Sequence, residues 1–256
     1  MKLIKDCWNV FVRHLRSTRR LPVFLFISII QPALWLFLFG QLFGVITTVE
    51  GFNVDSYPQF LAPALAVMAA LFSSSFIGVG LLVDMQQGVL TRLLVTPVGR
   101  GAIIIGRIMD ITAQALVQAL VLLGLAMLTH ARPVGGVVGI LVVLGAAILL
   151  SGIFASLSNL LALVTLRQEA IIAVMNFISL PMTFTSSMII PHDLMPGWIR
   201  MLSRFNPLDW GVSAARIGYQ GGPLQEAAVP LAMLAGLLLV TLTLTIGALK
   251  RYERSL

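Results

Sequence analysis

The side chains that most often do chemistry in proteins are few in this chain and lie far apart. The three histidines, His14, His130 and His192, and the single cysteine, Cys7, match no pattern of metal ligands or of nucleophile and base. Cys7 and His14 fall on neighbouring sides of one expected helix, but two ligands do not make a zinc site. A lone cysteine also excludes an internal disulfide. We therefore predict no catalytic residue and no metal site in this chain.

One segment has glycines at the spacing of a phosphate-binding loop. The sequence GAIIIGRI (101–108) ends in Arg-Ile, where such a loop requires Lys followed by Ser or Thr to hold phosphate and magnesium. It is also apolar and leads into a hydrophobic run. Arg107 lies within this segment and Asp110 just after it. The two residues are one helical turn apart, so they can form a structural ion pair. We predict no nucleotide site and no cofactor bound by this chain.

The composition is typical of an integral membrane protein. Of the 256 residues only 11% are charged, whereas a soluble domain carries roughly a quarter. A helix needs about 20 apolar residues to cross roughly 30 Å of hydrocarbon. Six segments reach that length: 22–46, 58–82, 108–129, 134–160, 170–190 and 228–249. We predict one all-α membrane domain over 1–256, whose first span is retained because no small-residue cleavage site follows it.

The positions of lysine and arginine predict the orientation of the spans. If the N-terminus is cytoplasmic, 13 of the 17 basic residues fall in cytoplasmic segments and four in outer segments. The positive-inside rule then places both termini in the cytoplasm. This asymmetry explains the net charge of +7. The sequence contains no basic patch with interleaved aromatic residues, so we do not expect a nucleic-acid partner.

Residues 1–20 are expected to form a helix that lies at the membrane surface. Trp8 and Phe11 belong to its apolar face and Arg13 to its basic face. Such a helix suits the headgroup layer of the inner leaflet. A simple lipid anchor and a contact with a partner protein both explain this pattern.

The stretch VDMQQGVLTRLLVTPVGR (83–100) joins the second and third expected spans. Its apolar residues recur at helical spacing from Met85 to Leu94, with polar residues opposite. Thr96-Pro97 ends the pattern, because the residue before proline disfavours the helical conformation. We expect an amphipathic helix over 84–96, which either lies on lipid or inserts into a groove of a cytoplasmic partner.

The segment 191–226 precedes the last span and is expected to hold two short outer helices. Pro196 can open the first helix, which includes Trp198. Asn206 is a plausible N-cap for the second, followed by Pro207 at its first position. Trp198 and Trp210 suit the outer membrane interface, where aromatic belts lie.

Three stretches together resemble the permease subunits of type-2 ABC exporters. GVLTRLLVTPVGR (88–100) is similar to their cytoplasmic loop, NPLDWGVSAAR (206–216) to a motif before their last span, and RQEAIIAVMNFISLPMTFTSSMIIP (167–191) to their fifth span. The chain length, the six spans and the two long connections agree as well. The departures are Val89 and Thr91 for the usual Thr and Glu, Trp210 for Tyr, and Ser187 for Gly.

The resemblance implies that 84–96 is a coupling helix, which docks on a separate ABC ATP-binding subunit. ATP and Mg²⁺ would then be bound by that partner. By this resemblance, the residues implied to contact the ATP-binding subunit are Gly88, Leu90, Leu93, Leu94, Thr96 and Pro97.

The resemblance also implies a dimer of permeases, homomeric or heteromeric, in which spans one, two and five face a central path. Soft apolar side chains that can line this path are Phe24, Phe37, Phe72, Met175, Phe177, Met182 and Phe184. The outer segment is implied to form a partly re-entrant cap over the path, with Trp198, Asn206, Pro207, Trp210 and Arg216.

The expected function is therefore export from the cytoplasm or inner leaflet across a bacterial inner membrane. An apolar path suits an amphipathic or lipid-like substrate of the drug, lipid or glycan class. The alternative is an ion-coupled secondary transporter of hydrophobic molecules, which is disfavoured because no span centre carries an obvious acid or base. A membrane-embedded enzyme is disfavoured by the scattered histidines.

Overall fold

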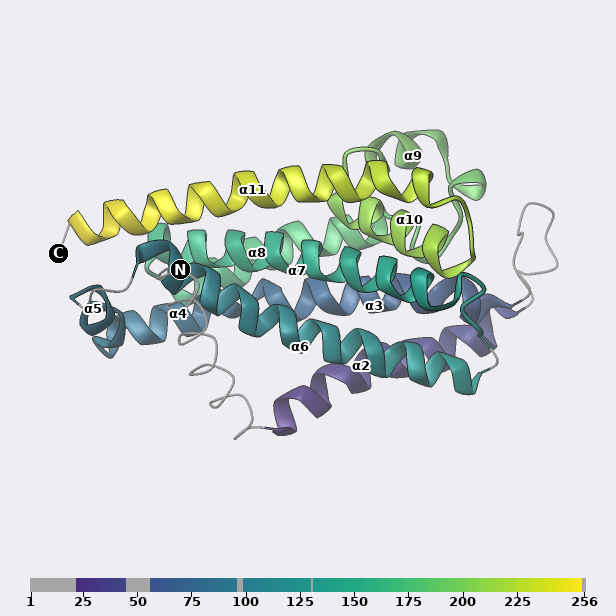
Figure 1. The fold of residues 1–256 in the computed structure, drawn as a ribbon, viewed down its shortest axis with the longest axis horizontal. Helices are drawn as coiled ribbons and strands as arrows, with labels where there is room; N and C mark the ends of the chain where they lie inside the picture. Colours follow the sequence, from purple (N-terminus) through teal and green to yellow (C-terminus); the bar gives the residue numbers. More distant parts are fainter. Residues whose placement is uncertain (1–21, 45–55, 96–98, 130, 255–256) are drawn as a thin grey trace.

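The computed structural model describes residues 22–44, 56–95, 99–129 and 131–254, and these residues form helices without any strand (Figure 1). The α-helices are α2 (Pro22–Leu42), α3 (Tyr57–Ser75), α4 (Ile77–Gln86), α5 (Val89–Leu94), α6 (Arg100–Leu128), α7 (Gly136–Thr165), α8 (Gln168–Phe184), α9 (Gly197–Ser203), α10 (Pro207–Tyr219) and α11 (Leu224–Arg254). The surface helix expected over 1–20, with Trp8, Phe11 and Arg13, lies outside the described residues.

Four helical segments are long and apolar enough to cross a membrane. They are Tyr57–Gln86, Gly101–Leu128, Gly136–Thr165 and Leu224–Arg254. Two further apolar helices, Ser28–Leu42 and Gln168–Phe184, are shorter. The prediction of an all-helical membrane protein is confirmed, whereas the count of six spans stays a prediction. Several helices are longer than the spans expected from the sequence. Charged residues such as Arg107 mark the end of an apolar run, but the helix continues through them.

The helices lie roughly along one axis, with α3 at the centre (Figure 1). Sixteen of the nineteen residues of α3 are buried, and α3 contacts α2, α6, α7, α8 and α10. A helix that is apolar on all sides is expected to be buried in this way. At one end of the molecule lie α5 and the C-terminus, and at the other lie α9 and α10.

The segment Tyr57–Gln86 is interrupted at Phe76, between α3 and α4. Phe76 has φ −110° and ψ 8° and therefore leaves helical geometry. The N–H groups in the first turn of a helix have no partner within that helix. Here the N–H of Gly78 donates to Ser158 Oγ of α7 at 2.9 Å. A Cβ atom at position 78 would overlap the backbone oxygen of Ser158, so only glycine allows this approach of α4 to α7.

Hydrogen bonds also join other helices across the bundle. Gln118 Nε2 of α6 donates to Ser28 Oγ of α2 at 2.7 Å. Thr245 Oγ1 of α11 lies 2.9 Å from the backbone oxygen of Ser156 in α7. Bonds of this kind stabilise helix pairs in membranes, where burial of apolar surface gives little preference for one neighbour over another.

We predict that Gly78→Ala destabilises the fold by about 1–3 kcal/mol, because the added methyl group overpacks the contact with Ser158. The measurement is thermal unfolding of the purified, detergent-solubilised protein. Gly145→Ala is the matched control, since a Cβ there meets nothing within 4 Å. It is expected to be neutral or to stabilise by about 0.5–1 kcal/mol. Equal unfolding temperatures for the two variants would contradict this role of Gly78.

Candidate functional site

The connection between α4 and α6 contains two helical pieces rather than one. Residues 84–86 complete α4, Gly88 adopts the left-handed conformation with φ 70°, and α5 covers only Val89–Leu94. The continuous helix expected over 84–96 was therefore wrong. A glycine in this conformation just after the last turn is a common way to end a helix. The apolar spacing continues across Gly88, which is why the sequence pattern concealed the break.

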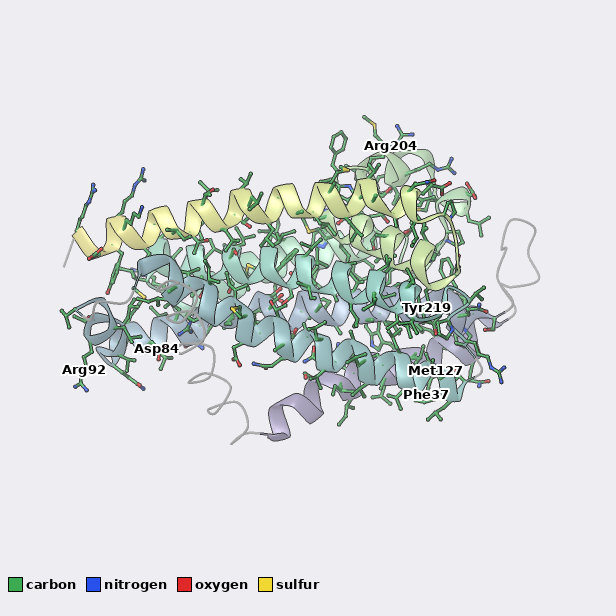
Figure 2. The ribbon with its side chains drawn as sticks, viewed as in Figure 1. Phe37, Asp84, Arg92, Met127, Arg204 and Tyr219 are labelled. Atoms are coloured by element: carbon green, nitrogen blue, oxygen red, sulfur yellow. The ribbon has the colours of Figure 1, made fainter. Side chains whose placement is uncertain are left out.

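The residues of α5 differ strongly in their exposure. Leu90 is 1% exposed and belongs to the core of this chain, and Leu93 is half-buried against that core. Thr91 and Arg92 are exposed, and Val95 is 83% exposed. Arg92 lies at the tip of this end of the molecule (Figure 2). Leu90 thus anchors α5 from within, whereas Thr91, Arg92 and Val95 are available to a partner. The side chain of Leu94, together with Thr96 and Pro97, lies outside the described residues.

An ion pair fixes the end of α4 against α6. Asp84 of α4 contacts Arg107 of α6, and the two side chains are 22% and 6% exposed. The sequence suggested Asp110 as the partner of Arg107 because the two are one turn apart. Asp110 accepts a hydrogen bond from Gln114 Nε2 at 3.0 Å. Periodicity within one helix could not reveal a partner on another helix.

A cavity of about 350 Å³ lies between α2, α3 and α8. Two of the expected path residues, Phe72 and Phe184, line it. The other lining residues, among them Gln31, Trp35, Ser73 and Thr183, were not predicted from the sequence. The cavity therefore combines aromatic walls with uncharged polar groups.

Met175, Met182, Phe37 and Phe177 do not line this cavity. Met175 has no exposed surface and Met182 is partly buried against the core, so the placement of Met175 on an open path is wrong for this conformation. Phe37 and Phe177 are 44% and 79% exposed on the outside of α2 and α8. The side chain of Phe24 lies outside the described residues.

The difference between Met175 and Phe177 follows from the two faces of α8. A stripe at four-residue spacing, Ile171, Met175, Ser179 and Thr183, is buried in the bundle. Phe177 and Phe184 belong to the other side of the helix, and both are largely exposed. Both faces are apolar, so composition alone could not tell which one packs inward.

The start of α10 holds the segment that follows α8. Asn206 Oδ1 accepts from the N–H of Leu208 at 2.9 Å and so caps α10, as expected, with Pro207 at the first position. Its Nδ2 donates to the backbone oxygen of Met182 at 2.7 Å. One residue thereby caps its own helix and binds the last turn of α8.

Asp209 and Arg216 extend this contact, and both hold Ser187. The N–H of Ser187 donates to Asp209 Oδ1 at 2.6 Å, and Arg216 Nη2 donates to the backbone oxygen of Ser187 at 2.9 Å. The guanidinium of Arg216 also lies 3.7 Å from the centre of the Phe60 ring, an attractive cation–π geometry. We call Asn206, Asp209 and Arg216 the outer clamp.

The two tryptophans of the outer segment lie in different surroundings. Trp198 of α9 is 66% exposed, consistent with a place at the membrane interface. Trp210 is half-buried, and its Nε1 donates to the backbone oxygen of Arg204 at 2.7 Å. Arg204 itself lies at the outer edge of the molecule near α9 (Figure 2).

Comparison with known proteins identifies this arrangement. The family described as ABC-2 type transporter matches residues 5–219. The chain belongs to that family. It is the permease subunit of a transporter, and the family implies that an ATP-binding subunit acts with it. The match extends from the N-terminal region through α5 and the cavity to the end of α10.

Relatives of the permease carry names that agree with this assignment. The transport permease ycf38 of Cyanophora paradoxa is 31% identical over 84% of this chain and 74% of its own. The doxorubicin resistance ABC transporter permease protein DrrC of Mycobacterium tuberculosis is 27% identical over 77% and 70%. The daunorubicin resistance ABC transporter permease protein DrrB1 of Streptomyces coeruleorubidus is 25% identical over 91% and 82%.

We predict that Asp209→Ala destabilises the permease by about 2–3 kcal/mol, because the buried N–H of Ser187 loses its acceptor. Thermal unfolding in detergent measures this loss, and cleavage by a protease near residue 187 reports the local opening. Asp193→Ala removes an exposed carboxylate from the same region and is expected to change stability by less than about 0.5 kcal/mol. A stable Asp209→Ala variant that resists cleavage would contradict the clamp.

Proposed function

We propose that the permease exports an amphipathic or lipid-like molecule across a bacterial inner membrane, driven by a separate ATP-binding subunit that contacts α5. The observation that carries this proposal is the geometry of α5. Leu90 anchors it inside the permease, while Thr91, Arg92 and Val95 project from the end of the molecule. A short helix held rigidly on one side and exposed on the other suits docking into a partner's groove.

The α5 end is the cytoplasmic end in this proposal. The last turn of α11, whose basic residues are Arg251 and Arg254, lies at the same end of the molecule as α5 (Figure 1), as the positive-inside rule expects. Both termini are then cytoplasmic, and α2 and α8 complete six spans. With 21 residues α2 reaches about 32 Å, enough for a hydrocarbon core of about 30 Å. The shorter α8 is continued by the turn that the outer clamp holds, so the outer segment forms a partly re-entrant cap.

Motion of the ATP-binding subunit passes from α5 into the bundle by two routes. The junction Gln87–Gly88 joins α5 to α4, and the pair Asp84–Arg107 joins α4 to α6. Beyond Phe76, α4 leads into α3, where Phe72 lines the cavity. ATP and Mg²⁺ are bound by the partner subunit. When its ATP sites close, the subunit moves α5 as a rigid body, and the movement changes the shape of the cavity.

A second permease chain completes the path. The cavity is flanked by apolar side chains that face outward from α2 and α8, including Leu34, Leu38 and Phe177 at 52%, 55% and 79% exposure. Exposed apolar surface of this kind marks a contact with another protein or with lipid. A second copy, or a related permease, seated on these faces turns the cavity of each chain into one central path.

The lining of the cavity supports an amphipathic substrate. Its described walls carry the aromatic rings of Trp35, Phe72 and Phe184 and the uncharged polar groups of Gln31 and Thr183. Two of the relatives are named for resistance to doxorubicin and daunorubicin. An ion-coupled carrier, the alternative, needs a titratable side chain at its substrate site, and the described residues that line this cavity are uncharged.

We predict that Arg92→Glu combined with Val95→Asp abolishes copurification of an ATP-binding subunit, because the pair places two carboxylates on the docking face. Mass spectrometry of material purified from membranes identifies the partner. The matched control is Met201→Asp combined with Arg204→Glu, which makes the same kind of change on exposed residues of the opposite end. If the first variant retains the partner as fully as the control, α5 is not the docking site.

We predict that Phe184→Ala raises the substrate concentration that half-stimulates ATP hydrolysis by the assembled transporter about tenfold. The reason is the loss of one buried aromatic contact with substrate. Daunorubicin is the probe. Phe184 is 70% exposed in the permease alone, so its truncation leaves the fold intact. Leu239→Ala, on a 66% exposed residue of α11, is expected to respond as wild type. If both variants need the same daunorubicin concentration for half-stimulation, the cavity is not part of the substrate path.

A further inference from the structure

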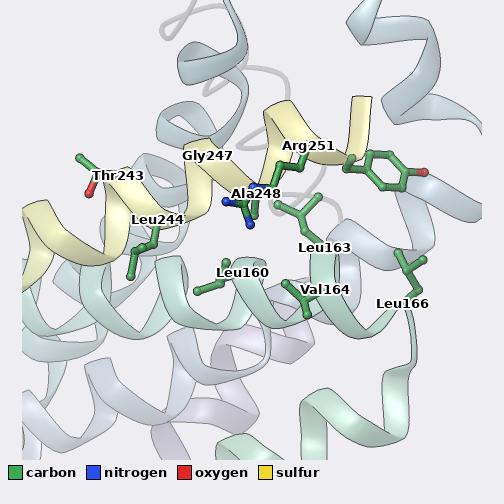
Figure 3. A pocket seen from close by; sticks show the side chains of 10 residues that line it. Leu160, Leu163, Val164, Leu166, Thr243, Leu244, Gly247, Ala248 and Arg251 are labelled. Carbon is green, nitrogen blue, oxygen red and sulfur yellow. The ribbon is translucent and has the colours of Figure 1, made fainter. Parts of the chain in front are cut away.

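A second hollow lies on another side of the permease, between the ends of α7 and α11 nearest the C-terminus (Figure 3). Its volume is about 460 Å³. We call it the α7–α11 groove. The residues of its walls that matter here are Leu160, Val164, Leu244, Gly247, Arg251 and Tyr252. It shares no residue with the cavity between α2, α3 and α8.

The groove faces the surroundings of the bundle rather than its core. Val164 and Leu244 are 67% and 55% exposed, and both belong to helices long and apolar enough to span a membrane. Because these side chains are apolar and exposed, we expect lipid to border the groove. At Gly247 a Cβ atom would meet nothing within 4 Å, so the wall of α11 is open there.

The length of the groove matches one leaflet of the membrane. Its wall on α11 runs from Thr243 to Tyr252, a rise of about 14 Å at 1.5 Å per residue. This is about half of the roughly 30 Å of hydrocarbon in a bilayer. The groove thus extends from the level of the last basic turn of α11 to about the middle of the membrane.

The charged group of the groove lies at one end. Aliphatic side chains and Thr243, whose hydroxyl donates to the backbone oxygen of Val240, form the walls up to Arg251 and Tyr252 at the end of the spanning helix. The side chain of Arg251 turns toward Ala248 and over α7 (Figure 3), so its guanidinium covers the apolar floor. The apolar walls can accommodate an acyl chain, and the guanidinium can bind an anionic group. A phospholipid carries both of these groups.

The charge around the mouth of the groove favours an anionic headgroup. Lys250 and Arg254 are exposed in the same turn of α11 as Arg251, and Glu253 is the acidic residue of that turn. Basic pockets between spanning helices on the cytoplasmic side bind anionic headgroups, and each basic side chain near such a surface adds attraction. A zwitterionic headgroup gains less from this cluster because its own cation is repelled.

We propose that the α7–α11 groove binds an anionic phospholipid of the inner leaflet. One acyl chain lies along Leu160, Val164 and Leu244, and the headgroup phosphate contacts Arg251. The leaflet is assigned from the orientation in the proposed function, on which this part of the inference rests. The lipid lies against both α7 and the inner end of α11, beside Gly247, where the surface of α11 is open.

Native mass spectrometry of the whole, delipidated permease tests the apolar part of the site. Phosphatidylglycerol and phosphatidylcholine with identical acyl chains are added at equal concentration. Wild type is expected to retain one phosphatidylglycerol in preference to phosphatidylcholine. Gly247→Leu fills the groove and is expected to lower that retention at least tenfold. Gly236→Leu is the matched control, because it adds the same side chain to the same helix at another open, exposed position.

A second pair of variants tests the charged part. Arg251→Gln is expected to weaken phosphatidylglycerol binding about fivefold, the effect of one basic side chain near an anionic surface, and to abolish the preference over phosphatidylcholine. Arg254→Gln removes the same charge from the same turn outside the groove and is expected to keep the preference. Equal retention by the two glycine variants, or equal selectivity of the two arginine variants, overturns the proposal.

The orientation is tested separately. In a Cys7→Ser background, Lys250→Cys is exposed to a membrane-impermeant thiol reagent added from the outer side of intact cells. Protection from the reagent agrees with a cytoplasmic position. Labelling would overturn the inner-leaflet assignment and the orientation of the proposed function, while the mass-spectrometric result on the groove itself would stand.

Discussion

The fold depends on a rule of the bilayer: a helix that breaks inside hydrocarbon must find protein partners for the backbone groups it frees. The segment Tyr57–Gln86 breaks at Phe76. In the turn that follows, the hydroxyl of Ser158 accepts a hydrogen bond from the N–H of Gly78. With this N–H satisfied, α4 continues from the break at Phe76 toward α5 at the end of the bundle (Figure 1). The pair Asp84–Arg107 joins the end of α4 to α6, next to α5, which exposes Thr91, Arg92 and Val95.

The same rule explains the other end of the molecule. Helix α8 ends at Phe184, and the polar backbone of the next residues would be unsatisfied without partners. The outer clamp supplies them, since Asn206 binds the last turn of α8 while Asp209 and Arg216 bind Ser187. Asn206, Asp209 and Arg216 of the NPLDWGVSAAR stretch therefore have a structural role in this permease. The clamp lies at the end of the molecule opposite α5.

The sequence predicted the features that repeat along one helix. Apolar length indicated the membrane helices, and Asn206-Pro207 indicated the start of α10, which the hydrogen bond to Leu208 confirms. It failed where the answer depends on a second helix or on one backbone angle. Left-handed Gly88 divides the expected coupling helix although the apolar spacing runs through it, and Leu90 points into its own chain. The burial of Met175 and the pairing of Arg107 with Asp84 depend on neighbours far along the chain.

The central claim is that α5 touches an ATP-binding subunit through its exposed face, and site-specific photo-crosslinking in intact membranes tests this contact directly. Val95 is replaced by a benzoylphenylalanine and, in a separate variant, Arg204 at the opposite end is replaced in the same way. We expect a crosslink from position 95 to a protein with an ATP-binding site, and no such crosslink from position 204. A crosslink from position 95 to lipid alone would contradict it, because α5 would then lie on the membrane surface.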